Sequence, residues 1–296
     1  MSDSKKIDLH VHTTYSDGYL SPQKIVQEIK KNQLDVVSIT DHDNIEGLKK
    51  VKSLSPNLNI INGIELSTKI KVNKKNYHPH ILGYGFDINN EELSYTIEKM
   101  KLLRTKYYLE YLNKLKVELK ELFPTKIVEK INLNKYCFID KIILDNLNTD
   151  NYSTKEIKII RKALYKYPFR ISNEYRIEFE EAIDLIHQAG GYTSLAHPEK
   201  SIENRSDLKQ VLDVGKIKSL DGIEVLLYGM PEKDKQFYHK LLREYNLKTT
   251  IGSDFHINVG NRKKIIGIKK GIELQAKDAT LLNKIMCREL KRERVI

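Results

Sequence analysis

Short apolar segments alternate with amphipathic segments along most of the chain. Runs rich in β-branched and apolar side chains are typical of buried strands. The predicted strands are Ile7–His12, Asp35–Thr40, Asn59–Leu66, Ile81–Tyr84, Tyr192–Ala196, Gly222–Leu226 and Thr249–Gly252. Most of them are followed by a segment with helical spacing of its apolar residues. This alternation predicts an α/β fold built on a parallel sheet or barrel.

Two of the intervening helices have clear boundary signals. Ser21 precedes Pro22, and an N-cap serine followed by proline in the first turn predicts a helix that runs to about Lys31. The segment Phe179–Gln188 has apolar residues at helical spacing and ends just before a pair of glycines. Both helices support the α/β interpretation.

The middle of the chain breaks this alternation, because helical periodicity continues there with almost no strand signal. The leucines between Leu102 and Leu119 predict one long helix that runs to Pro124, and Ser153 with Glu156 forms a capping-box pattern before another helix. We therefore expect a helical insertion in an α/β domain. The expected division is residues 1–94 with 177–296 for the barrel domain, and residues 95–176 for the insertion, which would form a lid over the substrate.

The composition is that of a folded protein rather than a disordered or membrane-spanning one. Of 296 residues, 40% are hydrophobic and 31% are charged, and no apolar run is long enough to cross a membrane. The N-terminus has no apolar signal-peptide core. The two cysteines, Cys137 and Cys287, lie far apart, which excludes a disulfide scaffold and a cysteine zinc module. We expect a cytoplasmic protein.

The chain is basic, with 51 Lys+Arg against 40 Asp+Glu, a net charge of +11. Such an excess indicates an anionic partner such as a phosphate ester or a nucleic acid, although codon bias alone also produces Lys-rich chains. Residues 95–176 contain 18 Lys+Arg and 10 Asp+Glu, which is +8. Most of the excess charge therefore belongs to the predicted insertion.

Histidines and carboxylates recur at the ends of the predicted strands. His10 and His12 lie two residues apart at the end of the first strand, so both side chains point to one face. The other members of the set are Asp17, His42, Glu65, His80, His197, Asp254 and His256. In a parallel barrel the strand ends meet at one rim, where such folds place their chemistry. Imidazole and carboxylate ligands in this number predict a site for Zn, Mn or Fe ions.

Other histidines are weaker candidates. A single histidine is usually structural, so His187 and His239, on helical segments, are given no role. His78 and His80 flank a proline and can be read as a ligand pair. We favour His80, because it leads directly into the apolar strand Ile81–Tyr84.

The motifs together resemble the polymerase-and-histidinol-phosphatase (PHP) phosphoesterase family, over about Lys5–Tyr84 and Phe179–His256. The matching pieces are Asp8-Leu9-His10-Val11-His12-Thr13, Tyr15-Ser16-Asp17-Gly18, Ile39-Thr40-Asp41-His42-Asp43, Gly63-Ile64-Glu65, His80-Ile81-Leu82-Gly83-Tyr84, Ala196-His197-Pro198 and Gly252-Ser253-Asp254-Phe255-His256. They occur in the family's order. The resemblance implies a distorted (β/α)7 PHP barrel, with a helical insertion, that holds three divalent metal ions.

The resemblance also implies a role for each member of the set. His10, His12, Glu65 and Asp254 would hold the first metal, Glu65 would bridge to a second that His80 and His197 complete, and Asp17, His42 and His256 would hold the third. Of these residues, Asp17, His42, Glu65, Asp254 and His256 are expected to take part in catalysis. Asp41, beside a ligand, is expected to orient His42. The expected reaction is hydrolysis of a phosphate ester by a metal-activated hydroxide.

Within the family, the chain is most similar to stand-alone members with a helical insertion, which act on 3′,5′-bisphosphonucleotides and on 5′ ends of RNA. Arg104, in the insertion, is a candidate contact for a substrate phosphate; the alternative is a solvated helix face. Two departures from those members concern the substrate pocket. The insertion lacks their Gly-Arg-Pro-His motif, and Asp221-Gly222-Ile223-Glu224-Val225 continues into Leu226-Leu227-Tyr228 instead of an aromatic and polar pair.

The expected partner is therefore a phosphate-bearing nucleotide or a short RNA or DNA, with no obligate protein partner and no membrane. Two alternatives stay open. One is a histidinol-phosphate phosphatase or another small-molecule phosphatase. The other is a metal-stabilised nucleic-acid-binding module without turnover, against which the complete set of ligand-type residues argues.

Overall fold

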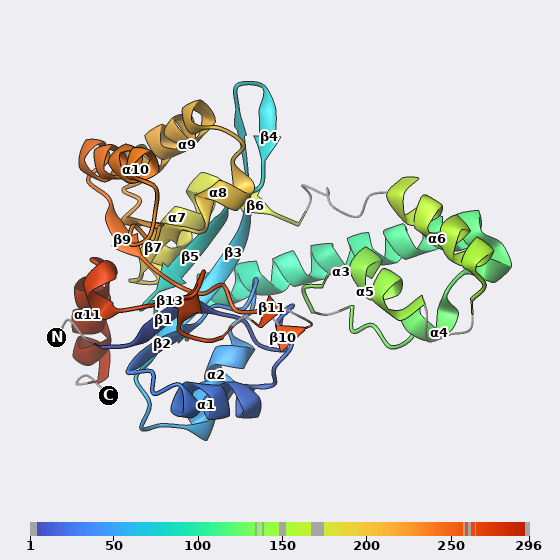
Figure 1. Cartoon of the computed structure of the whole chain (residues 1–296), viewed down its shortest axis with the longest axis horizontal. Coiled ribbons are helices and arrows are strands. Elements are labelled where there is room, and N and C mark those ends of the chain that lie inside the picture. The colour runs from blue at the N-terminus through green and yellow to red at the C-terminus, as the bar shows by residue number, and fades with distance from the viewer. Residues whose placement is uncertain are drawn as a thin grey trace. The chain divides into compact units, whose positions relative to one another are not determined.

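The computed structural model describes residues 5–133, 135–137, 139–147, 152–166, 175–256, 258–259, 262–263 and 265–293. The chain divides into two compact units (Figure 1). The barrel unit consists of Met1–Thr96 and Ile177–Ile296, and the insert unit consists of Ile97–Arg176.

The barrel unit is built on one curled sheet. Its main path, in spatial order, is β1 (Ile7–Val11), β2 (Val36–Ile39), β3 (Ile60–Val72), β5 (His80–Tyr84), β7 (Tyr192–Leu195), β8 (Gly222–Glu224) and β9 (Lys248–Thr250). Each of these strands lies at one of the segments predicted from the apolar pattern. The amide of Leu9 donates to the carbonyl of Ile251 at 3.2 Å, and the amide of His12 donates to the carbonyl of Phe255 at 3.0 Å. These bonds join the two ends of the path, and the predicted α/β barrel fold is confirmed.

One strand departs from the predicted parallel arrangement. β5 is antiparallel to both β3 and β7, whereas β1, β2 and β3 pair in parallel, as do β7, β8 and β9. The cause is the connection, because a parallel crossover needs a dozen or more residues. β3 instead turns at Asn73 and Lys74, both with positive φ, into β4 (Lys75–Tyr77), which leads directly to β5. The start of β5 therefore lies at the rim where its parallel neighbours end.

Helices connect and cover the strands of the barrel unit. They are α1 (Pro22–Lys31), α2 (Glu46–Leu54), α7 (Phe179–Gln188), α8 (Pro198–Ser201), α9 (Arg205–Ile217), α10 (Glu232–Glu244) and α11 (Leu282–Glu293). The short elements are β6 (Ile177–Glu178), β10 (Asn258–Val259), β11 (Arg262–Lys263), β12 (Ile268–Lys269), β13 (Ile272–Glu273) and the 3-10 helix η3 (Ala276–Asp278). The Ser21 hydroxyl accepts from the amide of Lys24, which confirms the predicted cap of α1.

The core of the barrel unit lies inside the curled sheet and beneath its last helix. Every residue of β1 is buried. Apolar side chains from β1, β2 and β5 pack with Leu281, Leu282 and Ile285 at the start of α11. The strands are therefore held rigidly, and the side chains at their rim have fixed backbones beneath them.

The insert unit has a hydrophobic core of its own. Its helices are α3 (Glu91–Leu119), which begins in the barrel unit, the 3-10 helix η1 (Lys120–Leu122), α4 (Thr125–Val128), α5 (Ile139–Asn146) and α6 (Thr154–Lys166). The buried face of α3 uses Tyr108 and Tyr111 together with Leu112, Leu115 and Leu119. Leu102 and Leu109, which belong to the leucine pattern that predicted this helix, are exposed.

The boundary signals inside the insert unit behave as the sequence indicates. The Ser153 amide donates to the Glu156 carboxylate at 2.7 Å, and the Glu156 amide donates to the Ser153 hydroxyl at 3.3 Å, which is a capping box.

Among the described helices of the whole chain, none combines the length and the apolar character that a membrane crossing requires.

Candidate metal centre

The rim of the barrel gathers all nine histidine, aspartate and glutamate side chains predicted as ligands. Within the described residues they form four overlapping groups whose ligand atoms lie within 4.8 Å of one another. The groups are His10 with His12 and Asp254; His10 with Glu65 and His197; His42 with Glu65 and His80; and His12 with Asp17, His42 and His256. Most of these side chains are fully buried, so their charge must be compensated inside the protein.

Four candidate ligand side chains converge at the end of β1. The Nε2 atoms of His10 and His12 lie 3.0 Å apart, and each lies 3.1 Å from Oε2 of Glu65. Oδ1 of Asp254 lies 3.5 Å from both nitrogens. A tetrahedral zinc ion with ligand distances of about 2.0–2.2 Å separates its ligands by about 3.3–3.6 Å. The donors therefore fit a divalent ion by their chemistry, and the separations to Asp254 lie in this range, whereas those among His10, His12 and Glu65 are a few tenths of an ångström shorter.

Glu65 connects this group to a second one. Its Oε2 atom faces His10 and His12, whereas its Oε1 atom lies 2.9 Å from Nδ1 of His80 and 3.0 Å from Nε2 of His197. Nδ1 of His42 lies 3.3 Å from Oε2 as well. The two oxygens of one carboxylate thus face different sets of imidazoles, an arrangement suited to bridging two metal ions. The antiparallel direction of β5 is what places His80, the first residue of that strand, at this rim.

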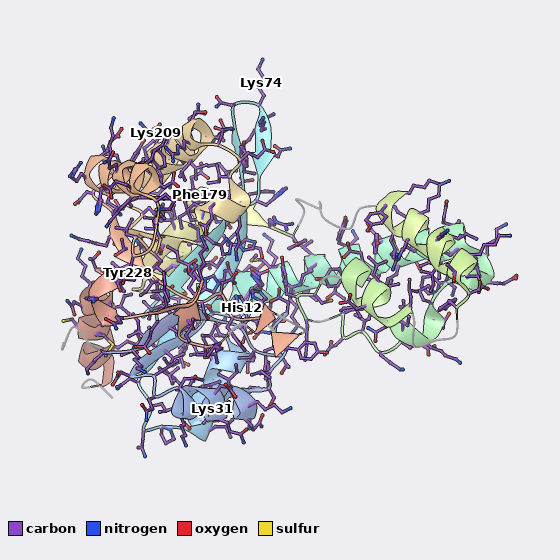
Figure 2. All side chains as sticks on the ribbon, in the orientation of Figure 1. His12, Lys31, Lys74, Phe179, Lys209 and Tyr228 are labelled. Carbon is purple, nitrogen blue, oxygen red and sulfur yellow. The ribbon has the colours of Figure 1, made fainter. Side chains whose placement is uncertain are left out.

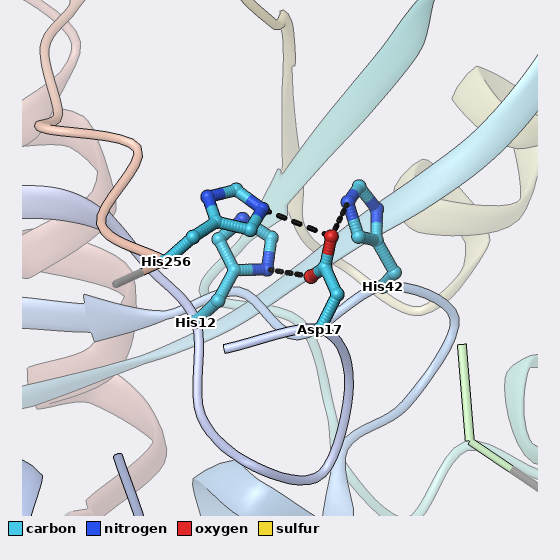
Figure 3. Close-up of side chains that lie close together, drawn as sticks. All are labelled: His12, Asp17, His42 and His256. Carbon is cyan, nitrogen blue, oxygen red and sulfur yellow. Dashed lines mark ion pairs between the residues drawn. The ribbon is translucent and has the colours of Figure 1, made fainter. Parts of the chain in front are cut away.

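A third group surrounds Asp17, as Figure 3 shows. Oδ2 of Asp17 lies 3.1 Å from Nε2 of His256 and 3.8 Å from Nε2 of His42, and Oδ1 lies 3.6 Å from Nδ1 of His12. Oδ1 of Asp17 is buried and has no hydrogen-bond partner among the described residues. His12 therefore presents one nitrogen to the first group and the other to the third.

The electrostatics of the rim favour charged carboxylates. Burial disfavours their ionisation, but the surrounding imidazoles outweigh it and hold the pKa values of Asp17, Glu65 and Asp254 well below their usual range. Burial opposes the charge of His256, but Asp17 and Asp254 raise its pKa to about 10. A metal ion bound to these imidazoles must displace their protons, so we expect metal affinity to increase with pH.

Glu224, at the end of β8, is a functional residue that the sequence analysis missed. Its buried carboxylate lies 3.2 Å from Nδ1 of His10 and accepts from the backbone amide of His197 at 2.9 Å. Burial opposes its ionisation, but Lys269, with Nζ at 3.5 Å, and His10 lower its pKa to about 2. A carboxylate behind a metal-binding imidazole fixes the ring and its tautomer. The sequence feature that could have identified Glu224 is its position at the end of a strand, in Gly222-Ile223-Glu224.

Replacing Glu224 with glutamine should weaken metal binding by about 10–100-fold, the usual cost of losing a carboxylate that orients a ligand histidine. Titration calorimetry with Mn²⁺ or Zn²⁺ measures this. The matched control is Asp221→Asn, because Asp221 accepts from Nε2 of His187 at 2.8 Å away from the rim. That variant should keep its metal affinity. Equal affinities for wild type and Glu224→Gln would contradict the orienting role.

Asp41 and Asp8 hold the loops that carry ligands. The sequence analysis expected Asp41 to orient His42, but its hydrogen bonds go to the amide and hydroxyl of Thr13, each at 2.7 Å, and to the hydroxyl of Ser16 at 2.6 Å. It therefore secures the turn that carries Asp17. Asp8, also buried, accepts from the amide and hydroxyl of Ser253, directly before Asp254. Burial raises the pKa of both carboxyls.

The remaining candidates occupy other environments. His78 belongs to none of the ligand groups within the described residues, which favours the choice of His80. Arg104 is 1% exposed, with its guanidinium carbon 5.6 Å from the centre of the Tyr136 ring. It is therefore not part of a solvated helix face, and its contact with substrate stays a prediction.

Comparison with known proteins decides the family. The sequence pattern of the PHP domain matches residues 8–281. The chain belongs to the PHP domain family. As a member of this family it is a hydrolase, with a rim of histidine and carboxylate side chains that suits divalent metals.

Relatives span most of this PHP protein. It is 27% identical over 269 residues to a 5′-3′ exoribonuclease of Haemophilus influenzae, covering 87% of this chain and 92% of the relative. It is 24% identical over 258 residues to a 3′,5′-nucleoside bisphosphate phosphatase of Chromobacterium violaceum, covering 84% and 87%. The solved structure of an amidohydrolase from Chromobacterium violaceum has the same fold, with a TM-score of 0.72 at 21% identity, over 96% of each chain.

Proposed function

We propose that this protein is a metal-dependent phosphoesterase that hydrolyses phosphate esters of nucleotides or short oligonucleotides. The observation that carries the proposal is the position of Glu65, whose two carboxylate oxygens face different sets of imidazoles at the rim. Two relatives that cover most of the chain are named for a nuclease and a nucleotide phosphatase. Both names describe hydrolysis of a phosphate ester next to a ribose.

Three divalent ions, drawn from Mn, Fe and Zn, are the proposed cofactors. His10, His12, Glu65 and Asp254 would hold one ion; Glu65, His80 and His197 would hold the second; Asp17, His42 and His256 would hold the third. Bound there, such ions supply a nucleophile at neutral pH and neutralise the charge of a phosphoryl group. Glu224 keeps Nε2 of His10 directed to the rim, and Asp41 keeps the loop of Asp17 in place.

The residues at the rim also explain why no protein nucleophile is needed. Each side chain of the nine-member set is an imidazole or a carboxylate; six of them are buried, and Asp17, His80 and His256 are partly buried. The protein's task is to hold these donor groups in place and to orient the phosphate ester.

The insert unit is the proposed lid over the substrate, and Arg104 is its proposed phosphate contact. Replacing Arg104 with alanine should raise KM for nucleotide substrates roughly tenfold while leaving metal content unchanged, since a charged hydrogen bond to phosphate is lost. Arg161, on α6, provides a control arginine. Unchanged KM for Arg104→Ala would leave Arg104 a structural residue packed on Tyr136.

A substrate panel tests the proposed function. Purified protein with Mn²⁺ should release product from adenosine 3′,5′-bisphosphate or from short 5′-phosphorylated RNA faster than from histidinol phosphate, and chelation should stop the reaction. Inorganic phosphate and mononucleotides are measured separately, which distinguishes a phosphatase from an exonuclease. Preference for histidinol phosphate would favour the small-molecule phosphatase instead. Binding of RNA without release of any product would favour a module without turnover.

A further inference from the structure

A cavity of about 460 Å³ lies in the barrel unit beside the metal centre. Its walls come from α8, α9, the loop after β8, α10 and the turn between β12 and β13. The apolar and aromatic side chains that line it include Leu208, Leu226, Tyr228, Phe237, Tyr238 and Ile272. A cavity of this size and lining is typical of sites for small organic groups.

The cavity adjoins the metal centre through three segments of chain. Pro198 and Glu199 line it and directly follow His197. Val225 lines it and directly follows Glu224. Lys269 lines it as well, and its Nζ atom lies 3.5 Å from Oε1 of Glu224. A substrate whose phosphate reaches the rim therefore has its adjoining group within reach of this cavity.

Two cations that line the cavity, Arg205 and Lys269, are paired with carboxylates of the protein. Arg205 forms an ion pair with Asp234 and lies over the ring of Phe237, 4.2 Å from its centre. Lys269 is paired with Glu224. A phosphate bound here would have to compete with those carboxylates. The apolar and aromatic surface favours an uncharged, planar group instead.

Tyr228 is the side chain best placed to contact such a group. It lines the cavity and is 65% exposed, so much of its ring is accessible to a ligand. Figure 2 labels it on the barrel unit. The loop that carries it is held in place: Gly229 has a φ of +72°, and a Cβ atom there would lie 2.6 Å from Cδ1 of Ile272. This loop is also where the chain departs from the resembling members, with Leu226 and Tyr228 after Val225.

We propose that this cavity binds the base of the nucleotide whose phosphate ester lies at the metal centre, with the base stacked on Tyr228. The inference rests on the proposed function and names the part of the substrate that this site selects. Stacking on an aromatic side chain tolerates any base, because every base has a π-face. The cavity therefore selects for nucleotides over other phosphate esters without selecting a sequence.

The test compares substrates with and without a base. For wild type with Mn²⁺, kcat/KM for adenosine 3′,5′-bisphosphate should exceed that for abasic ribose 3′,5′-bisphosphate by roughly tenfold or more. Tyr228→Ala should lose most of this preference through KM, and Tyr228→Phe should keep it. Leu226→Trp, which fills the cavity, should also lose it. The matched control is Tyr95→Ala, since Tyr95 is equally exposed at 65% and lies on α3.

A binding measurement separates this proposal from the proposed function. The fluorescence of 2-aminopurine riboside 3′,5′-bisphosphate should be quenched by wild type and by Tyr95→Ala, and not by Tyr228→Ala. Quenching without hydrolysis of any nucleotide would overturn the proposed function and keep the cavity as a base site. Equal rates of hydrolysis for the substrates with and without a base would overturn the base site alone. So would a Tyr228→Ala variant that keeps the wild-type preference for the substrate with a base.

Discussion

Glu65→Gln should lower kcat/KM for nucleotide phosphate esters by about a thousandfold. The change removes a charge that faces His10 and His12 through one oxygen, and His80 and His197 through the other. The expected factor corresponds to a loss of about 4 kcal/mol of transition-state stabilisation, because each 1.36 kcal/mol is a factor of ten in rate. Steady-state hydrolysis with Mn²⁺, together with metal content measured by plasma emission, provides the test.

The control for this variant is Glu46→Gln. Glu46 begins α2 on the surface of the barrel unit and is paired there with Lys49. It should retain wild-type kinetics and metal content. Wild-type rates and metal content in Glu65→Gln would show that no ion depends on the Glu65 carboxylate, and the proposed bridge would have to be abandoned.

Divalent metal should raise the unfolding temperature of wild type by about 5–10 °C. A ligand that binds the folded state alone at a hundred times its Kd stabilises it by about 2.7 kcal/mol, and each kcal/mol corresponds to about 2–4 °C for a domain of this size. The metal is expected to stabilise the folded state because the barrel rim holds several buried carboxylates and imidazoles close together. Differential scanning calorimetry with and without Mn²⁺ or Zn²⁺ measures the shift.

Asp254→Ala makes this measurement specific to the rim. Oδ1 of Asp254 lies 3.5 Å from Nε2 of both His10 and His12, so the variant removes one candidate ligand of this group. The variant should show at most a small metal-dependent shift and should lose hydrolysis, and His197→Ala should behave likewise. A full shift and full hydrolysis in both variants would place the metal elsewhere in the molecule.

The elements of the barrel could be predicted because they follow local rules. β-branched runs favour strands, and Ser21 and the capping box at Ser153 form hydrogen bonds with residues three positions away. The leucine pattern predicted the long helix but not which face it buries: Tyr108 and Tyr111 are buried, whereas Leu102 and Leu109 are exposed. Which residues a helix buries depends on its packing partners.

The ligand set could be predicted because parallel strands end at one rim, so His10, His12 and His197 converge wherever the barrel closes. Glu65 is an exception in detail, since β3 continues to Val72 and places it within the strand rather than at its end. Glu224 was missed because a single glutamate at a strand end carries no distinctive pattern. Its role depends on a hydrogen bond to a histidine 214 residues earlier in the chain.

The sequence alone therefore determined the strand and helix segments, the division into barrel and helical insertion as an expectation, and the nine side chains expected at the rim. The tertiary structure decided the direction of β5, the two-sided contacts of Glu65, the partners of Asp41 and the cavity beside Tyr228. The physical reason is the distance along the chain over which each kind of interaction acts. Hydrophobic period and caps act over a few residues, whereas the positions of buried charges depend on strands brought together from distant parts of the chain.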